Sequence, residues 1–214
     1  MRQMHQEKHA DGHLLLILLV IAALAFVAAS LVPHDESASL AQSAPPQQIQ
    51  QHHIQAPVAS GPYTVVGPPT IRAASINALL CATYRGRRST ACGTGEALYQ
   101  LGVKYGIDPI YALAFFKHES QFGTQGVAVS THGLGNIRCS PGYACIGGYR
   151  AYATWEQGYE DWYRLILYGY VQGGVSSQCP CRTVKQIIPV YAPTEDHNDV
   201  EAYITAVETA VDSW

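Results

Sequence analysis

The sequence predicts a mainly α-helical (α+β) domain with a small loop or hairpin lobe, preceded by one transmembrane helix. Three patterns support this prediction. Apolar residues recur at helical spacing in several segments after residue 75. Residues 126–153 show no helical period and are rich in Gly, Ser and Pro, with two cysteines. Residues 14–32 are apolar except for Ser30, and at about 1.5 Å rise per residue this run is long enough to cross a bilayer.

The apolar run has positive charges on its N-terminal side only. Arg2 and Lys8 precede it, and the next Lys or Arg is Arg72. The positive-inside rule therefore predicts a cytoplasmic tail at residues 1–13, a signal anchor at 14–32 and an outward-facing remainder. The alternative is a cleaved signal peptide, which would leave the protein secreted. Because the run exceeds the usual signal-peptide core of about 7 to 15 residues, the anchor is favoured.

Residues 33–69 are rich in Gln, Ser, Ala and Pro and have little periodic apolar signal. This composition predicts a disordered linker with a root-mean-square reach of roughly 35 Å. A domain of ordinary size is then expected over residues 70–214. The net charge of −3, without a basic cluster, argues against nucleic acid as the main partner.

Start and stop signals divide this domain into helices. A short apolar helix is predicted over residues 75–84 and a second over 94–105, where Gly106 ends it. A third begins at Pro109, which suits the first helical position, with Asp108 as its cap. Three later helices each begin after a cap that is followed, three residues on, by Glu or Gln. These caps are Thr154, Thr183 and Asn198.

All six cysteines follow the membrane segment, which places them in an oxidising compartment under the predicted topology. In chain order they are Cys81, Cys92, Cys139, Cys145, Cys179 and Cys181. An even number in an exported domain predicts disulfides, although sequence alone does not choose their connectivity. Short separations favour local pairing of the first two and of the next two, which leaves the last two as a third pair. Zinc is the alternative, but the spacings do not repeat a Cys-x-x-Cys module.

One carboxylate, Glu119, falls in the last turn of the helix that begins at Pro109. The negative end of the helix dipole disfavours its charged form, and the flanking Phe115, Phe116 and Phe122 are expected to exclude water from it. Both effects raise the pKa of Glu119. A carboxylic acid that is still protonated near neutral pH is what protonation of a glycosidic oxygen requires. The alternative is a solvated surface glutamate.

Four segments appear together in the order and spacing of a known family. They are GIDPIYALAFFKHESQFGT (106–124), HGLGNIRC (132–139), GGYRAYATWEQGYEDW (147–162) and YAPTEDHNDVEAY (191–203). Over roughly residues 94–214 the chain resembles the endo-β-N-acetylglucosaminidase (glucosaminidase) domains of bacterial cell-wall hydrolases, in the lysozyme-like superfamily. The helix carrying the Glu-Ser pair is the most specific element. The resemblance implies a lysozyme-like fold, Glu119 as general acid, and peptidoglycan or a related N-acetylglucosamine glycan as substrate, outside a bacterial plasma membrane.

The resemblance also aligns Tyr191 with a tyrosine that lies in the cleft of related domains, where a phenol orients the acetamido group or stacks on sugar. Asn136, in the Gly-Asn-Ile turn, is expected to hydrogen-bond the same group. Further side chains are expected as sugar platforms or cleft-lining groups, and core packing or capping is the alternative for each. They are Tyr149, Tyr152, Phe122 and His132.

The sequence departs from the family where a second acid often lies, because no Asp or Glu occurs between Ser120 and Trp155. The next acids occupy the first turns of a helix or a later loop, where dipole, capping and solvation explain them. They are Glu156, Glu160, Asp161, Glu195, Asp196 and Asp199. We therefore expect Glu119 to act as a lone acid, assisted by the 2-acetamido oxygen of the substrate. No metal or cofactor is expected.

Three alternatives remain open. Attack by the sugar's own 6-hydroxyl would give an anhydro product, as the related lytic transglycosylases make. A wall-binding module of the same fold would bind glycan without turnover, and the missing second acid favours it. A thiol peptidase using Cys139 and His132 is disfavoured by the even cysteine count.

Overall fold

The computed structural model describes residues 62–214, in which helices dominate the regular structure, and the mainly α prediction is confirmed. The α-helices are α1 (Ala73–Cys81), α2 (Gly95–Tyr105), α3 (Pro109–Ser120), α4 (Ala128–Thr131), α5 (Trp155–Arg164), α6 (Val184–Tyr191) and α7 (Val200–Asp212). A π-helical segment, η2 (Leu165–Val171), continues α5, and a 3-10 turn, η3 (Thr194–Asp196), precedes α7. The predicted tail, the transmembrane segment and residues 33–61 of the linker lie outside the described residues. Within 62–214, no helix is long and apolar enough to span a bilayer.

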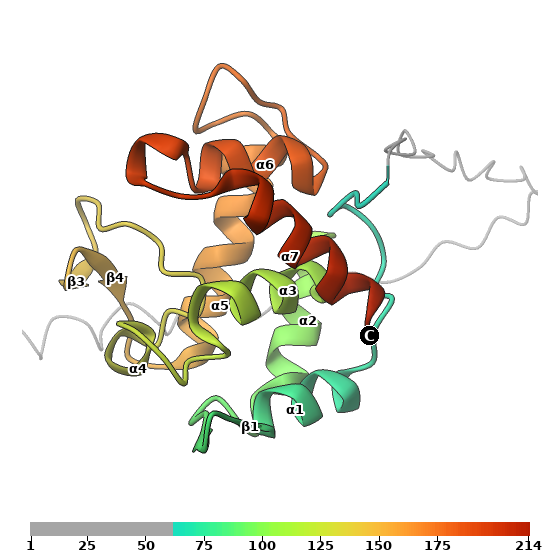
Figure 1. Cartoon of the computed structure of the whole chain (residues 1–214), viewed down its shortest axis with the longest axis vertical. Helices are drawn as coiled ribbons and strands as arrows, with labels where there is room; N and C mark the ends of the chain where they lie inside the picture. The colour runs from blue at the N-terminus through green and yellow to red at the C-terminus, as the bar shows by residue number, and fades with distance from the viewer. Residues whose placement is uncertain (1–61) are drawn as a thin grey trace, which may run out of the picture. The chain divides into compact units, whose positions relative to one another are not determined.

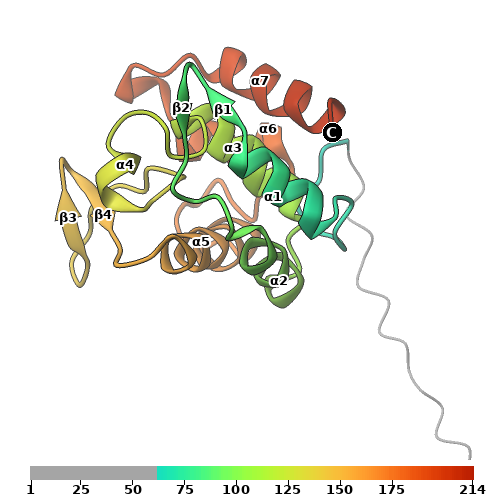
Figure 2. The ribbon, with the colours of Figure 1, turned by 90° about the horizontal axis from the view of Figure 1, so that it is seen from below.

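Helix α3 is the central helix of the domain. Figure 2 shows it between α7 on one side and α5 and α2 on the other. As predicted, the Asp108 side chain caps it by accepting from the Ile110 N–H at 3.1 Å, and Pro109 occupies the first turn. Every residue from Pro109 to Phe116 is buried, so α3 is apolar on all sides over these two turns. Such a pattern is typical of a helix enclosed by others, and it places the last turn of α3 at the edge of the core.

Helix α3 ends in an unusually tight turn. Gln121, Phe122 and Gly123 all have positive φ, at 47°, 57° and 76°. A Cβ atom at Gly123 would lie 2.6 Å from the Trp155 ring and 2.8 Å from Leu134. Glycine is therefore required here both by backbone conformation and by close packing, as expected for a residue that ends a helix.

The core is rich in aromatic rings contributed by α3 and α5. The Trp162 ring packs edge-on against Phe115 and Phe116, with centroid separations of 5.4 and 5.2 Å. Tyr159 stacks on Phe116 at 5.8 Å. All four side chains are fully buried. Because such rings bury large apolar areas with defined orientation, they fix α5 against the helix that carries Glu119.

Residues 126–153 form the predicted irregular lobe, which lies at one side of the domain in Figure 1. It contains the single turn α4 and an antiparallel hairpin of β3 (Ala144–Ile146) and β4 (Tyr149–Ala151). A second, shorter hairpin joins β1 (Thr83–Tyr84) to β2 (Arg87–Arg88) after α1. The strands are few and short, so the domain remains mainly helical.

The three predicted disulfides are present and are local in sequence. They join Cys81 to Cys92, Cys139 to Cys145, and Cys179 to Cys181. No cysteine in the described part of the chain is free. The pairing of Cys139 removes the thiol that a peptidase mechanism would need.

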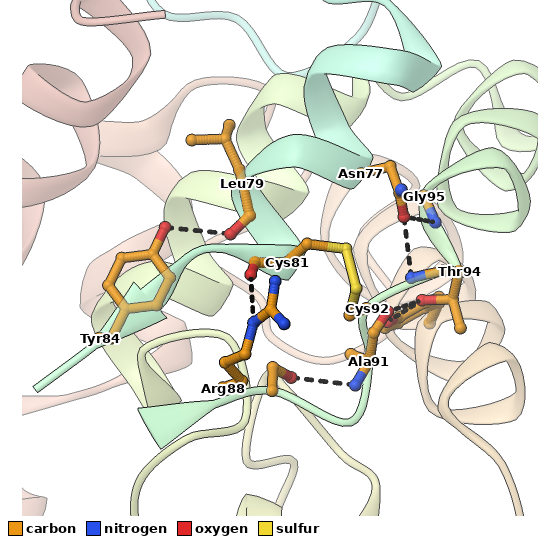
Figure 3. The surroundings of a disulfide bond; sticks show 12 residues. Asn77, Leu79, Cys81, Tyr84, Arg88, Ala91, Cys92, Thr94 and Gly95 are labelled. Carbon is orange, nitrogen blue, oxygen red and sulfur yellow. Dashed lines mark hydrogen bonds between the residues drawn. A yellow bond between two sulfur atoms is a disulfide. The ribbon is translucent and has the colours of Figure 1, made fainter. Parts of the chain in front are cut away.

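The Cys81–Cys92 bond ties the end of α1 to the segment before α2 (Figure 3). Beside it, Asn77 Oδ1 accepts from the backbone N–H of Gly93 at 2.9 Å and of Gly95 at 3.4 Å. A Cβ atom at Gly95 would lie 2.6 Å from the Asn77 backbone nitrogen. The absent side chain therefore lets α1 and α2 approach closely.

Three predicted boundaries need correction. The first helix was expected over residues 75–84, but α1 begins at Ala73 and ends at Cys81, and Thr83–Tyr84 form β1. Residues 63–67 were assigned to the linker, but Val65 is fully buried and its N–H donates to the Arg182 carbonyl at 2.8 Å. This segment belongs to the domain because its backbone pairs with residues far along the chain. Helix α7 was expected to begin after Asn198, whereas Asp199 is its cap and accepts from the Ala202 N–H at 3.0 Å. The caps predicted at Thr154 and Thr183 are confirmed.

Candidate active site

A cleft of about 350 Å³ lies where the end of α3, the irregular lobe and the α6–α7 connection meet. Glu119 comes from the last turn of α3, and the other lining residues come from the irregular lobe, from η2, and from α6 and its connection to α7. The polar and aromatic groups that line it are Glu119, Asn136, Arg138, Tyr149, Arg150, Tyr170, Tyr191, Asp196 and Asn198. The cleft therefore joins residues from four of the sequence segments that carry the family resemblance.

The Glu119 carboxylate is half-buried and held by two donors. Tyr203 donates its hydroxyl to Oε1 at 2.6 Å, and Asn136 donates its side-chain amide to Oε2 at 3.2 Å. The same Asn136 amide donates to the Glu119 backbone carbonyl at 2.9 Å. These three bonds fix the carboxylate in one orientation at the wall of the cleft.

Burial is the largest influence on the pKa of Glu119, and it raises that pKa above the ordinary value. The hydrogen bonds from Tyr203 and Asn136, and the positive charge of Arg138, act in the opposite direction but do not cancel the effect. The carboxyl group therefore keeps its proton to higher pH than a solvated glutamate does. A group of this kind is able to act as a general acid.

Tyr203 was not singled out from the sequence, although it stands at the end of the segment 191–203. It is 3% exposed and lies on the buried face of α7, which packs along α3. His118 stacks on its ring with the centroids 3.7 Å apart. The available signal was the helical spacing of Tyr203, Ile204 and Val207, which places Tyr203 on the face that meets α3.

Asn136, which was predicted to bond the acetamido group of the substrate, lies beside Glu119 in a turn with φ of 45°. Its side-chain nitrogen is committed to Glu119, but its Oδ1 is buried and has no hydrogen-bond partner among residues 62–214. A buried acceptor without a partner is costly. Because this oxygen is buried, Asn136 holds Glu119 from within the wall of the cleft and does not present an open acceptor to a ligand.

Tyr191 also lines the cleft, and its hydroxyl donates to the Gly135 carbonyl. Its ring packs edge-on against Phe115 with centroids 5.3 Å apart. A Cβ atom at Gly135 would lie 2.5 Å from the Trp162 ring and 2.9 Å from the Tyr191 hydroxyl. Tyr191 therefore anchors the turn that carries Asn136 as well as forming part of the cleft surface.

Tyr149 lines the cleft as expected, whereas three other predicted residues do not. Phe122 is fully buried against Tyr84, so it presents no surface to a sugar and its assignment as a platform is corrected. Tyr152 donates to Asp161 Oδ2 at 2.6 Å, and the His132 ring bonds the Tyr152 carbonyl at 3.0 Å. These two residues hold the irregular lobe together outside the cleft.

Asp196 is the only acid besides Glu119 among the described residues that line this cleft. It forms an ion pair with Arg138 at 3.6 Å. Two of the other acids weighed from the sequence, Glu160 and Asp161, are committed to structural contacts. Glu160 pairs with Lys104 at 2.6 Å, and Asp161 pairs with Arg150 at 2.8 Å.

A larger hollow of about 830 Å³ adjoins the cleft and shares Val190, Pro193 and Asn198 with it. Its other lining residues come from residues 176–201, and Glu119 is not among them. The smaller cleft is therefore the candidate active site because it contains the half-buried Glu119 carboxyl group. Comparison of the chain with protein-family models, curated proteins and solved structures gives no match.

Proposed function

We propose that residues 62–214 form a lysozyme-like glycoside hydrolase that cleaves N-acetylglucosaminyl linkages in peptidoglycan. The observation that carries this proposal is the half-buried Glu119 in the cleft, with a raised pKa and a fixed orientation between Tyr203 and Asn136. The sequence resemblance assigns the same residue the role of general acid. The N-terminal apolar segment then anchors the domain at the outer face of the plasma membrane, where disulfides persist.

The proposed reaction uses one protein carboxyl group. Glu119 gives its proton to the glycosidic oxygen as the bond from that oxygen to the anomeric carbon breaks. The carbonyl oxygen of the substrate's 2-acetamido group forms a bond to the same carbon and takes up the positive charge. Glu119, now ionised, removes a proton from water as the water oxygen attacks, which restores both the acid and the acetamide.

The surrounding residues have separate roles in this scheme. Asn136 donates its side-chain amide to Oε2 and to the backbone carbonyl of Glu119, which keeps the acid at the wall of the cleft. Tyr203 donates to Oε1, and Oε2, the oxygen with the weaker contact, carries the transferred proton. Tyr149 provides an aromatic platform for a sugar through the ring face that Arg138 does not cover.

Replacing Glu119 with Gln tests the proposal because the shape of the side chain is kept while the acid is lost. The full chain and E119Q are incubated with purified peptidoglycan, and the released fragments are analysed by mass. Soluble fragments with new reducing ends are expected from the parent, and none from E119Q, whose circular dichroism spectrum should be unchanged. Release by E119Q at the parental rate contradicts the assignment.

The same mass analysis distinguishes two alternatives. Fragments lighter by one water than the hydrolysis product identify a lytic transglycosylase, in which the 6-hydroxyl attacks instead of water. Sedimentation with peptidoglycan without release identifies a wall-binding module. Both alternatives use the cleft, but only the binding module makes no use of the proton on Glu119.

A further inference from the structure

Two charged residues face each other across the cleft that contains Glu119. Arg138 belongs to the irregular lobe, and Asp196 ends η3 in the connection between α6 and α7. The Arg138 Nη2 atom and the Asp196 Oδ2 atom are 3.6 Å apart, and the two side chains are 65% and 48% exposed. An exposed ion pair with this separation contributes little to stability, so its partners exchange readily.

The Arg138 guanidinium keeps its place in the cleft without Asp196. It lies over the Tyr149 ring, 5.0 Å from the centroid, and the backbones of the two residues form an isolated bridge. Cation–π stacking of this kind orients the planar guanidinium. Arg138 therefore presents hydrogen-bond donors to the cleft whether or not Asp196 is bound.

Arg150, the other arginine that lines the cleft, is already committed. Its Nη1 donates to Asp161 at 2.8 Å, and its Nη2 donates to the Ser140 hydroxyl at 2.8 Å. Only Arg138 remains as an exchangeable cation among the described residues of this cleft. Its positive charge acts on the Glu119 carboxyl, which shows that the two groups lie within electrostatic range.

We propose that Arg138 binds a free carboxylate on the glycan beside the bond that is cut, and that this carboxylate replaces Asp196. The inference rests on the proposed function and narrows its substrate. Guanidinium and carboxylate match in geometry and charge, so the exchange conserves the ion pair that the empty cleft makes internally. The preferred substrate is an N-acetylated amino-sugar chain whose carboxyl groups are free rather than linked to peptide through an amide.

Asp196 then has a definite role in selectivity. While it is paired with Arg138, the contact spans the cleft and opposes entry of a chain. A neutral or amidated chain has no anion to offer in exchange, whereas a carboxylated chain does. Once the exchange has occurred, Asp196 is left near a second negative charge, so its removal should strengthen binding of the acidic chain.

Binding to the inactive E119Q chain tests this inference. Two oligosaccharides of alternating N-acetylglucosamine and N-acetylmuramic acid are compared by calorimetry, one with free lactyl carboxylates and one with these groups converted to methyl amides. We expect the free acid to bind about tenfold more tightly, the magnitude typical of one charge-assisted contact. R138Q in the same background should bind both chains equally, and D196N should bind the acid more tightly still.

Arg72→Gln is the matched control, because Arg72 is exposed and lies outside the cleft. It should leave the preference for the acid unchanged. Equal binding of the two chains by E119Q, or a preference that survives in R138Q, overturns the inference. If the active chain cleaves the amidated oligosaccharide as fast as the acid, the proposed function stands and the inference fails. If the active chain cleaves neither, the proposed function fails and the inference with it.

Discussion

Two arginines twelve positions apart, Arg138 and Arg150, line the same cleft but differ in how they are held. The Arg150 side chain is 15% exposed, donates to Asp161 and Ser140, and lies 3.9 Å from the Tyr143 ring centroid. The Arg138 side chain is 65% exposed and has one ion pair at 3.6 Å. Arg150 is thus a structural part of the cleft wall, whereas Arg138 is exposed enough to contact a ligand.

Their acidic partners differ in the same way. Asp161 accepts three hydrogen bonds, from Tyr143 at 2.9 Å, Arg150 at 2.8 Å and Tyr152 at 2.6 Å. These bonds between charged and hydroxyl groups tie the irregular lobe to α5. The Asp196 side chain pairs only with Arg138 among residues 62–214, and it lies in an exposed turn.

The largest expected effect comes from removing Asp161, the acidic partner of the less exposed arginine, Arg150. Asp161→Ala leaves the half-buried Arg150 guanidinium without its counter-ion and removes the acceptor of Tyr143 and Tyr152. Loss of a hydrogen-bonded partner of a charged, half-buried group typically costs about 1.5 to 3 kcal/mol. We expect a decrease of this size in the free energy of unfolding, measured with denaturant at pH 7. A decrease below about 1 kcal/mol would mean that the lobe is held by other contacts.

Asp161 also shows why some contacts could not be predicted from the sequence. From the sequence it was one of several acids near a helix start, and the helix dipole explained it sufficiently. Its partners, Tyr143, Arg150 and Tyr152, lie in the lobe that has no periodic pattern. Contacts of this kind depend on tertiary packing, which no local spacing encodes.

Predictions from the sequence succeeded where both interacting residues lie close together in the chain. The Asp108 and Thr154 caps were predicted because each depends on residues within a few positions. Glu119 was singled out for the same reason, since its place at the helix end is a local property. Tyr203 is 84 residues away from Glu119, and their contact required the packing of α7 on α3.

Glu119 extends the comparison, because burial of its carboxyl group carries a cost in stability. Its pKa is raised in the folded state, mainly by burial, above the ordinary value of 4.5. The favourable contribution of the protonated form is therefore complete below pH 4.5 and is lost as the pH rises through the folded-state pKa.

The second prediction concerns how the stability of the E119Q variant, relative to the parent, depends on pH. E119Q should unfold at a higher denaturant midpoint than the parent at pH 8, since the amide avoids the cost of ionising a buried carboxyl group. The difference should decrease as the pH is lowered towards 4.5, where the parent carries the proton. Denaturation series at several pH values measure this, with Glu96→Gln as an exposed control on α2. A difference that does not vary with pH would show that Glu119 titrates as a solvated group does.

The smallest expected effect comes from removing Asp196, the acidic partner of the exposed Arg138. Asp196→Ala should change the free energy of unfolding by less than about 1 kcal/mol, and high salt should reduce even this difference, because exposed pairs are screened by solvent and ions. The measurement is the same denaturant series used for Asp161→Ala, at low and high salt. A loss as large as that of Asp161→Ala would mean that the pair fixes the connection between α6 and α7. Arg138 would then be a structural arginine like Arg150, and a ligand carboxylate could displace Asp196 only by unfolding one wall of the cleft.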